Sequence, residues 1–454
     1  MSIFRAYDIR GIIGESLTPE IVTQIGHAIG SEAAARQQSK VVVARDGRLS
    51  GPELIEALID GLQKAGREVI DIGMMPTPVL YFATHYLKTG TGVMVTGSHN
   101  PPNYNGLKIM IGGDALSGET IQALKTRIDT NDLITGQGSR HTTEIHHAYL
   151  SHIHKDVKLA RPFKVVVDCG NGVAGTIAPH LLQTLGCEII PLFCEVDGHF
   201  PNHHPDPSMP ENMESLITAV QSEGADLGLA FDGDGDRLGV VDANGRIIWP
   251  DRQMILYATD LLKRHPGAQI LYDVKCSRHL RDAIKQHGGE PLMWKTGHSL
   301  IKTKMKETGA LLGGEMSGHI FFKERWYGFD DALYTAARLL EILSQDPRTP
   351  TEIFTALPDA INTPELKLEH EEFGQHYDLM QQISDTFSFK DAQISTIDGI
   401  RADFKDGWGL IRASNTTPCL VIRFEANSQE ALEKIQQLFR QQLLAIDQTL
   451  KLPF

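Results

Sequence analysis

The sequence predicts an α/β protein in which three topologically similar, mixed-sheet α/β domains and a C-terminal α+β domain surround a central cleft. Three observations lead to this prediction. The chain has 454 residues, enough for three or four domains. Short apolar strands alternate with helical stretches in three successive rounds, and the pattern changes after Pro350. No low-complexity linker separates the rounds, so we expect the four parts to pack together.

The first domain is predicted over residues 1–143. Thr18 and Pro19 are a typical N-cap and first helical residue, and apolar residues follow them at helical spacing. Ser50 and Glu53 have the spacing of a capping box, which predicts a second helix. Short runs rich in β-branched residues predict strands at 40–44, 68–72 and 92–96. This alternation is typical of a parallel or mixed sheet covered by helices.

The next two domains are predicted to repeat this order, and the last differs. Residues 144–246 contain predicted strands at 164–168, 188–190 and 226–230, and the Asn244-Gly245 turn predicts a closing hairpin. Residues 247–358 contain predicted strands at 269–273, 291–294 and 310–312. Residues 359–454 combine strands at 409–412 and 420–424 with a final helix, which indicates a smaller α+β domain.

The composition excludes some classes of protein. The formal net charge of −14 disfavours binding to nucleic acid or to an acidic membrane surface. The five cysteines form no CxxC pair, which favours reduced thiols in a cytosol. The start of the chain contains Arg5, Asp8 and Arg10 and no apolar core, so we expect no signal peptide. No apolar run approaches the length of a membrane span, and we expect a cytoplasmic protein.

Each domain contributes one polar, glycine-containing loop after an apolar strand, where open α/β sheets place ligand sites. The first loop is Thr96-Gly-Ser-His-Asn-Pro-Pro102. Gly97 permits a tight bend that presents Ser98 beside a possible proton carrier, His99. A serine nucleophile needs such an activating neighbour. Taken alone, the loop is more typical of an ordinary turn, in which serine and asparagine are common.

The second loop is Asp232-Gly-Asp-Gly-Asp-Arg237. Three carboxylates on alternate residues, with glycine between them, can curl around one hard cation, and oxygen ligands favour magnesium or calcium over zinc. Without a cation, three crowded like charges are costly. A calcium loop of the EF-hand type is the rival interpretation. That loop needs a late glutamate and flanking helices, whereas strands flank this one.

The third and fourth loops suit a sugar phosphate. Glu315 and Ser317, in the Gly313–His319 loop, would face the same way in an extended segment and could bind vicinal hydroxyls. The fourth loop, Arg412-Ala-Ser-Asn-Thr-Thr-Pro418, has the composition of a phosphate cradle but lacks the GxxxxGK pattern of a nucleotide-binding loop. Taken alone, a capped turn explains the third loop equally well, and a solvated turn explains the fourth.

Together the four loops predict more than each does alone. One offers a nucleophile, one a metal site, one hydroxyl recognition and one anion recognition, and four domains around one cleft would bring them together. Basic side chains would make that cleft locally positive within an acidic protein: Arg10, Lys108, Arg237, Lys275, Arg412 and Arg423. Tyr7 and His298 are weaker candidates, because a strand and a surface turn explain them as well.

The chain resembles the α-D-phosphohexomutase superfamily, most closely its bacterial phosphomannomutase/phosphoglucomutase branch. The resemblance extends from near residue 4 to the C-terminus in the family's order, with no departure at a motif position. The matching segments are FRAYDIRG at 4–11, TGSHNPP at 96–102, DGDGDR at 232–237, KTGHS at 295–299, GEMSGH at 314–319, FFKERWYGFDDA at 321–332 and RASNTTP at 412–418. The family fold, four domains around a central cleft with three of them alike, agrees with the repeat.

The resemblance also implies a role for each matching residue. The implied catalytic group is Ser98 as a phosphoserine, with Arg10, His99 and Lys108 around the transferring phosphoryl group, and His319, which would meet the sugar, is a further implied catalytic residue. The implied Mg²⁺ ligands are the phosphorylated Ser98, Asp232, Asp234 and Asp236. The implied substrate-binding residues are Tyr7, Arg237, Lys275, His298, Glu315, Met316, Ser317, Gly318, His319, Arg412, Ser414, Asn415, Thr416 and Arg423. Among these, Glu315 and Ser317 would meet the sugar O3 and O4 hydroxyls, and residues 412–416 the phosphate that does not react.

The implied activity is reversible phosphoryl transfer between the 1- and 6-positions of mannose and glucose phosphates. It would proceed through the phosphoserine and a 1,6-bisphosphohexose that also acts as activator. The expected partners are hexose phosphates, with no nucleic acid or membrane, and a monomer is expected. Three alternatives stay open: a phosphoglucosamine mutase, whose sugar loop typically has a different residue where Met316 stands, a metal-dependent sugar phosphatase, and a noncatalytic sugar-phosphate sensor.

Overall fold

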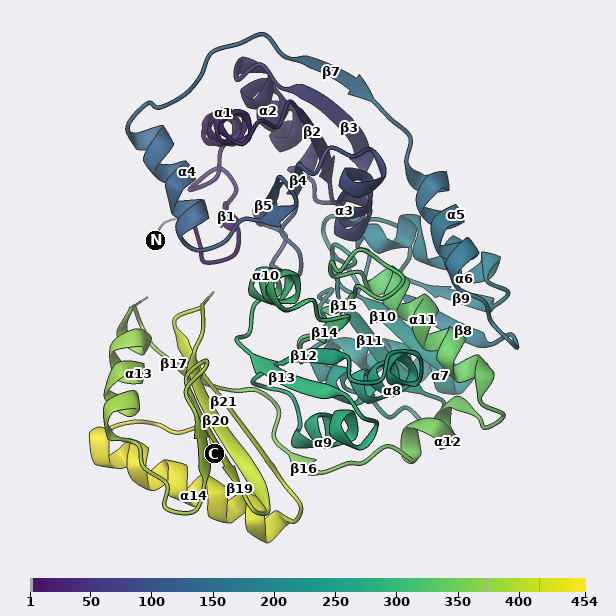
Figure 1. Ribbon diagram of the computed structural model, residues 1–454, viewed down its shortest axis with the longest axis vertical. Helices are drawn as coiled ribbons and strands as arrows, with labels where there is room; N and C mark the ends of the chain where they lie inside the picture. The colour runs from purple at the N-terminus through teal and green to yellow at the C-terminus, as the bar shows by residue number, and fades with distance from the viewer. Residues whose placement is uncertain (1–2, 373, 416) are drawn as a thin grey trace.

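The computed structural model describes residues 3–372, 374–415 and 417–454. It consists of four domains, each built on one sheet and numbered I to IV along the chain (Figure 1). Domains I to III contain mixed sheets with helices, and domain IV contains an antiparallel sheet with helices. This architecture confirms the predicted fold class. Within the described part of the chain, no helix combines the length and the apolar character that crossing a membrane requires.

Domain I has the strand order β1-β5-β4-β2-β3-β7, with β6 paired to β5. Its strands are β1 (Ile9–Ile12), β2 (Lys40–Arg45), β3 (Glu68–Met74), β4 (Gly92–Val95), β5 (Tyr104–Ile111), β6 (Asp114–Ala115) and β7 (Ser139–Thr142). Its helices are α1 (Pro19–Ala35), α2 (Gly51–Lys64), α3 (Thr77–Tyr86) and α4 (Glu119–Asp129). Successive valines of β2 are buried on both faces of the sheet, because α1 and α2 cover one face and α3 covers the other.

Both helices predicted in domain I begin at the expected residues, but only one has the expected cap. Thr18 caps α1, with its Oγ1 accepting a hydrogen bond from the backbone N–H of Ile21 at 3.4 Å, as expected. The predicted capping box at Ser50 is wrong, because the Ser50 side chain does not cap α2. Its hydroxyl instead accepts a hydrogen bond from Asn105 Nδ2 at 2.9 Å, which joins the start of the helix to the buried strand β5. A tertiary contact has replaced the local one.

Domains II and III repeat the central strand order of domain I. Their orders, β11-β10-β8-β9 and β15-β14-β12-β13, correspond to β5-β4-β2-β3. In each of these three sets of four strands, three strands are parallel and the fourth is antiparallel. This shared topology confirms the prediction of three similar units. At the predicted Asn244-Gly245 hairpin the chain does turn back: the Asp242 N–H donates to the Arg246 carbonyl at 3.0 Å, and a single bridge joins Val241 to Ile247.

The remaining elements follow in chain order. Domain II contains α5 (His146–Asp156), β8 (Lys164–Asp168), η1 (Val173–Thr176), α6 (Ala178–Thr184), β9 (Glu188–Leu192), η2 (Pro210–Met213), α7 (Glu214–Glu223), β10 (Leu227–Phe231) and β11 (Leu238–Asp242). Domain III contains α8 (Pro250–Arg264), β12 (Gln269–Asp273), α9 (Arg278–Gln286), β13 (Glu290–Trp294), α10 (His298–Thr308), β14 (Leu312–Gly314), β15 (Ile320–Phe322), α11 (Ala332–Gln345) and α12 (Pro350–Thr355). Domain IV contains β16 (Ile361–Asn362), β17 (Leu366–Glu369), α13 (Gln375–Thr386), β18 (Gln393–Ser395), β19 (Ile400–Phe404), β20 (Gly407–Ala413), β21 (Cys419–Ala426) and α14 (Gln429–Ile446).

The hydrophobic cores show how firmly the domains are joined. One cluster of buried side chains extends through domains I, II and III, from Val42 on β2 to Phe354 on α12. Domain IV has a cluster of its own, and among the described residues a small apolar cluster containing Val274, Trp408 and Leu410 joins it to domain III. Domain IV also lies at one end of the molecule, beside β13 and α9 (Figure 1). The first three domains therefore form one packed body, to which domain IV is attached by a smaller contact.

Asp331 at the N-cap of α11 is expected to be important for stability. Its buried carboxylate accepts hydrogen bonds from Tyr149 on α5 at 2.8 Å, from Trp326 Nε1 at 3.1 Å and from the backbone N–H of Tyr334 at 2.9 Å. An Asp331→Ala substitution leaves three buried donors unpaired and should lower the free energy of unfolding by about 3 kcal/mol. Urea unfolding measures this change. The exposed Asp282→Ala control should differ from the parent by less than about 0.5 kcal/mol, and an equal response of both variants would contradict the assigned role.

Candidate active site

Ser98 lies on the turn after β4, at the boundary between domains I and II. Its backbone φ of 50° is in the left-handed region, which is uncommon for a residue with a side chain and often marks a functional site. The buried Ser98 hydroxyl donates a hydrogen bond to Asp232 Oδ2 at 3.2 Å and lies 3.1 Å from His99 Nδ1. The structure thus brings the predicted nucleophile into contact with the first of the predicted metal ligands.

Two buried residues that the sequence analysis missed, Asp46 and Arg48, hold this turn. Asp46 Oδ2 accepts hydrogen bonds from Thr96 Oγ1 at 2.7 Å and from the backbone N–H of Gly97 at 3.1 Å. A Cβ atom at Gly97 would overlap the Arg48 guanidinium, so this position requires glycine. Arg48 donates hydrogen bonds, 2.5 to 2.9 Å long, to the carbonyl oxygens of Ser98, Asn100, Pro101 and Tyr104. The available signal was a charged pair around a glycine directly after an apolar strand.

The acidic loop joins β10 to β11, and its three carboxylates are fully buried. Asp232, Asp234 and Asp236 each present one oxygen, and these oxygens all lie within 4.8 Å of one another. Lys108 on β5 donates hydrogen bonds to Asp234 Oδ2 at 2.7 Å and to Asp236 Oδ2 at 2.5 Å. Thr77 Oγ1 at the start of α3 donates to Asp234 Oδ2 at 2.5 Å. Two elements of domain I therefore hold the acidic loop of domain II.

The charges of this loop are not balanced by Lys108 alone. Burial and the two neighbouring carboxylates raise the pKa of Asp232 well above its usual value. Burial also opposes the ionisation of Asp234 and Asp236, but the Lys108 ammonium holds the pKa of both below the usual value. Asp234 Oδ1 and Asp236 Oδ1 are buried and accept no hydrogen bond from the described residues. Such unfilled oxygens, in a set of carboxylate donors, fit a hard divalent cation.

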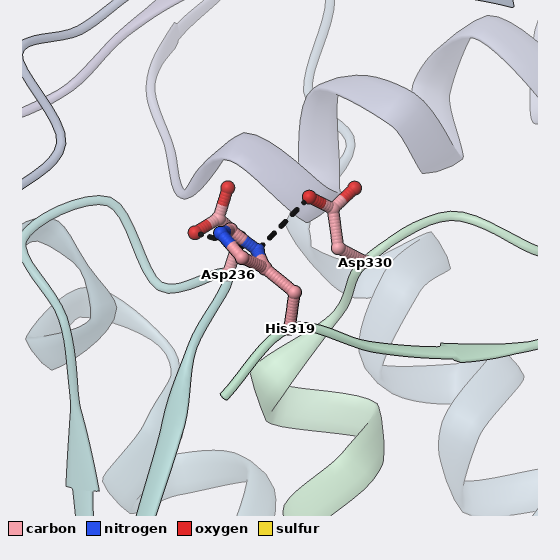
Figure 2. Close-up of side chains that lie close together, drawn as sticks. All are labelled: Asp236, His319 and Asp330. Carbon is pink, nitrogen blue, oxygen red and sulfur yellow. Dashed lines mark ion pairs between the residues drawn. The ribbon is translucent and has the colours of Figure 1, made fainter. Parts of the chain in front are cut away.

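His319 on the third loop lies between Asp236 and Asp330 (Figure 2). Its Nδ1 is 3.1 Å from Asp330 Oδ2 and 3.5 Å from Asp236 Oδ1. Arg237 Nε donates a hydrogen bond to His319 Nε2 at 3.0 Å, and because arginine cannot accept a hydrogen bond, the ring proton must be on Nδ1. These contacts therefore fix the orientation of the imidazole ring. Its Nε2 lone pair can accept a proton only when Arg237 moves away.

Lys302 and Asp330, which the sequence analysis did not single out, orient this part of the site. Lys302 Nζ donates a hydrogen bond to Asp330 Oδ1 at 2.8 Å and lies over the ring of Tyr81 at 4.3 Å. Although burial opposes ionisation, Lys302 holds the pKa of Asp330 well below its usual value. The Asp330 carboxylate therefore stays ionised beside His319. The signal for Asp330 was its place in the FFKERWYGFDDA segment, whereas Lys302 lies in an ordinary helical pattern.

The other two predicted imidazoles, His99 and His298, have lowered pKa values. Burial and the Arg237 guanidinium hold the pKa of His99 well below its usual value. Burial and the Lys302 ammonium do the same to the pKa of His298. Both rings are therefore uncharged near neutral pH. Of the predicted basic residues, Arg10 Nη2 donates a hydrogen bond to Asp8 Oδ2 at 2.5 Å and is partly buried.

The N-terminal segment joins domains III and IV. Tyr7 donates a hydrogen bond to the carbonyl oxygen of Thr296 at 2.9 Å, and its hydroxyl accepts one from Asn415 Nδ2. Asp398 Oδ2 accepts a hydrogen bond from the backbone N–H of Thr296 at 3.0 Å. Gly297 has a φ of 138°, and a Cβ atom there would lie 2.6 Å from the Tyr7 ring. Parts of domains I, III and IV thus meet around Tyr7.

In the fourth loop, Arg412 Nε donates a hydrogen bond to Asp398 Oδ2 at 2.9 Å. The Ser414 and Thr417 hydroxyls lie 2.9 Å apart, so the loop is closed by its own side chains. The predicted ligand Thr416 lies outside the described residues. The described residues of the predicted phosphate cradle, Arg412, Ser414 and Asn415, thus lie in one loop, and Asn415 contacts the Tyr7 hydroxyl.

The third loop differs from the expected conformation. Glu315, Met316, Ser317 and Gly318 form a turn, closed by the Gly318 N–H donating to the Glu315 carbonyl at 3.1 Å. The argument that two side chains of an extended segment face the same way therefore does not apply here. Glu315 is buried, its Oε1 accepts a hydrogen bond from the Gly297 N–H at 2.6 Å, and burial raises its pKa. This hydrogen bond holds the third loop against the turn at residues 295–299.

Lys275 and Arg423 already have protein partners. Lys275 Nζ donates a hydrogen bond to Glu365 Oε1 at 2.5 Å. Arg423 donates to the Lys275 carbonyl oxygen and lies 3.8 Å from Asp251 Oδ2. These contacts place Arg423 behind the Lys275 loop, where it supports that loop. Its expected role as a direct substrate ligand stays a prediction.

A buried serine beside three carboxylates, with neutral imidazoles and lysines around them and four domains meeting nearby, is typical of an enzyme that transfers phosphoryl groups. Comparison with known proteins agrees. Family models described as phosphoglucomutase/phosphomannomutase alpha/beta/alpha domains I, II and III match residues 1–135, 147–245 and 249–361. The model of the C-terminal domain of that family matches residues 363–442. The chain belongs to the phosphoglucomutase/phosphomannomutase family.

Individual relatives cover the whole chain. A Pseudomonas aeruginosa protein named phosphomannomutase/phosphoglucomutase is 58% identical over 453 residues, which are 100% of this chain and 98% of the relative. A Neisseria gonorrhoeae protein named phosphoglucomutase is 53% identical over 441 residues, 96% of each chain. A crystal structure of a phosphoglucomutase/phosphomannomutase family protein from Burkholderia thailandensis superposes with a TM-score of 0.95 at 52% identity, covering 100% of this chain and 99% of that one.

Proposed function

We propose that this protein catalyses the reversible transfer of a phosphoryl group between the 1- and 6-positions of mannose and glucose phosphates. The observation on which the proposal depends is the 3.2 Å contact between the Ser98 hydroxyl and Asp232 Oδ2, across domains I and II. This contact places the proposed nucleophile beside three carboxylates that are suited to bind a metal ion. The names of the relatives at 53% and 58% identity support the same reaction.

In this proposal Ser98 begins the cycle as a phosphoserine. The free hydroxyl of a hexose monophosphate attacks the phosphorus, the bond to Ser98 Oγ breaks, and a 1,6-bisphosphohexose forms. His319 Nε2 accepts the hydroxyl proton after Arg237 turns from it toward the substrate. Lys108 and Arg10 stabilise the charge on the transferring group. The bisphosphate then turns over, and its other phosphoryl group returns to Ser98.

We propose Mg²⁺ as the cation, held by Asp232, Asp234, Asp236 and the phosphorylated Ser98. The unfilled carboxylate oxygens of the acidic loop support this assignment. When bound, Mg²⁺ would draw charge from the phosphoryl oxygens in the transition state. Lys108, which already pairs two of the carboxylates, would keep them ionised for the cation.

The proposed substrate-binding residues come from all four domains. We propose that Glu315 and Ser317 bind the O3 and O4 hydroxyls, and that the 412–416 loop binds the phosphate that does not react. The other proposed ligands are Tyr7, Arg237, Lys275, His298, Met316, Gly318, His319 and Arg423. The proposed domain limits of 1–143, 144–246, 247–358 and 359–454 would give each domain one loop of the site.

The alternatives are less well supported. A phosphoglucosamine mutase is not favoured, because the relatives above 50% identity are named for mannose and glucose phosphates or for glucose phosphates alone. The solved N-acetylglucosamine-phosphate mutases share 12% to 15% identity with this chain and indicate the fold alone. We further propose that the protein acts as a monomer in the cytoplasm.

One assay tests the proposed reaction. The protein receives mannose 1-phosphate or glucose 1-phosphate with Mg²⁺ and a trace of the 1,6-bisphosphate, and the 6-phosphate is followed. We expect 6-phosphate from both sugars and an initial rate that rises with the trace of bisphosphate. Steady release of inorganic phosphate without 6-phosphate would identify a phosphatase instead. If glucosamine 1-phosphate, supplied in a parallel reaction, were the one sugar phosphate converted, the protein would be the aminosugar mutase.

Removing the cation should abolish most of the activity. Chelation with EDTA is expected to lower the rate at least about 10²-fold, because it removes a stabilising charge from the transition state, and added Mg²⁺ should restore it. Mg²⁺ at about 100 times its Kd should also stabilise the fold by about 2.7 kcal/mol. The rise in melting temperature that reports this stabilisation should vanish in Asp234→Asn and persist in the exposed control Asp129→Asn. A shift of equal size in both variants would place the cation elsewhere.

A further inference from the structure

Domain II contains two neighbouring thiols that the proposed reaction does not use. Cys169 directly follows β8, and Cys194 lies two residues after β9, the parallel neighbour of β8. Their Sγ atoms are 3.5 Å apart, and both thiols are free. A disulfide bond is about 2.05 Å long. Forming one here would therefore bring the two sulfurs about 1.5 Å closer together.

The two thiols differ in a way that suits stepwise oxidation. Cys194 is partly exposed, whereas Cys169 is fully buried in the core. The contact between the sulfurs lowers the pKa of Cys194 and raises the pKa of Cys169 well above its usual value. A small oxidant therefore reaches first the sulfur that ionises first. By contrast, Cys187 and Cys276 are buried, and burial raises the pKa of each thiol.

The two loops that bear these thiols are bonded to each other. The backbone N–H of Cys169 donates to the Leu192 carbonyl at 3.1 Å, and the N–H of Asn171 donates to the Phe193 carbonyl at 2.8 Å. A Cβ atom at Gly175 would overlap the carbonyl of Cys194, so the loops pack without free space. The backbone on both sides of the thiol pair is therefore held by direct contacts between the two loops.

The same two loops hold Gly233, the first glycine of the acidic loop, from two sides. The backbone N–H of Val173 donates to the Gly233 carbonyl at 3.2 Å, and the Gly233 N–H donates to the Pro205 carbonyl at 3.1 Å. A Cβ atom at Gly233 would overlap the carbonyl oxygen of Ser98. The segments that follow the two thiols therefore contact the acidic loop directly, at the glycine that packs against the Ser98 turn.

We propose that Cys169 and Cys194 form a dithiol that hydrogen peroxide oxidises to a disulfide, and that this disulfide lowers phosphoryl transfer by displacing the acidic loop. The Cys194 thiolate attacks one peroxide oxygen, the O–O bond breaks, and a sulfenic acid and hydroxide form. The Cys169 thiol then attacks the Cys194 sulfur, gives up its proton, and releases the sulfenic oxygen as water. In total the two thiols lose two electrons and one peroxide becomes two waters. The effect on activity rests on the proposed function, whereas the formation of the disulfide does not.

Peptide mapping by mass spectrometry tests the disulfide itself. The full-length protein is reduced, desalted, exposed to hydrogen peroxide and digested without reductant. We expect a peptide pair joined through Cys169 and Cys194, which disappears on treatment with dithiothreitol. Cys194→Ser should abolish the pair, and the matched Cys187→Ser control should keep it. Oxidation that leaves both thiols free, or that joins other cysteines, would overturn the proposal.

Activity and metal binding test whether the disulfide displaces the acidic loop and slows phosphoryl transfer. The fully cross-linked protein should isomerise hexose phosphates about tenfold or more slowly, because small displacements of catalytic groups have effects of this size. Its stabilisation by Mg²⁺ should also shrink, and dithiothreitol should restore both. Complete cross-linking with unchanged activity and unchanged Mg²⁺ response would refute this effect of the disulfide. Hydrogen peroxide should not slow isomerisation by Cys169→Ala, which cannot form the disulfide. If that variant does not fold, Cys194→Ser at the partly exposed position should show the same resistance to peroxide. A reduced protein that is inactive but still forms the cross-link would count against the proposed function alone.

Discussion

Replacing Ser98 with alanine is expected to lower the isomerisation of hexose monophosphates by at least about 10³-fold, a loss typical of removing a covalent nucleophile. Without the Ser98 hydroxyl no phosphoserine can form, and the bisphosphate cannot return a phosphoryl group to the protein. The fold should survive, since the turn is held by Asp46 and Arg48 through other groups. The measurement is the rate of 6-phosphate formation from glucose 1-phosphate, with urea unfolding as a check on stability.

The Ser98→Ala experiment needs two comparisons. The exposed Ser222→Ala variant on α7 controls for loss of a serine hydroxyl and should retain the parent rate. Intact mass before and after incubation with glucose 1,6-bisphosphate should show one added phosphoryl group on the parent and none on Ser98→Ala. Near-parental isomerisation by Ser98→Ala, or phosphorylation of that variant at another residue, would refute the phosphoserine mechanism.

Local patterns were sufficient to predict most of the fold. The apolar runs at 40–44, 164–168 and 269–273 are the central strands of three sheets with one strand order, because a strand buried on both faces shows in the sequence as a continuous apolar run. The predicted capping at Ser50 was wrong because Asn105, more than fifty residues away, competes for the hydroxyl. Local signals specify an element, and tertiary partners decide how its ends are satisfied.

The candidate site was predictable only where chemistry is concentrated in one segment. The acidic loop and the serine turn each form a compact motif, and the structure brings Ser98 and Asp232 together. Lys302 was missed because a lone charge in a helical pattern is more often solvated than buried. Asp330 was missed although it lies in the matched FFKERWYGFDDA segment, because no residue of that segment was given a role. The Glu315 turn was mispredicted for the related reason that two polar side chains with glycines fit either an extended segment or a turn.

Arg48 is the missed residue with the largest expected effect. In Arg48→Met, Asp46 becomes a buried charge without its ion pair at 3.4 Å, which should lower the free energy of unfolding by about 3 to 5 kcal/mol. Arg48→Lys keeps the charge and separates the two roles of the residue. A lysine ammonium cannot reproduce the planar fork that donates to four separate carbonyls of the turn. The turn should then lose its fixed position relative to Asp232.

For Arg48→Lys we expect kcat to fall about 10²-fold, since misplacing a reacting group by an ångström has an effect of that order. KM should change little, because the proposed sugar and distal-phosphate ligands lie mainly in domains III and IV and do not contact the turn. Steady-state kinetics with glucose 1-phosphate measures both constants. The Arg36→Lys variant, whose partly exposed guanidinium pairs with Glu32 on α1, is the matched control and should keep both values. If Arg48→Lys lost stability but kept the parental kcat, Arg48 would stabilise domain I without positioning Ser98, and the left-handed conformation of Ser98 would have to be maintained by the Asp46 hydrogen bonds alone.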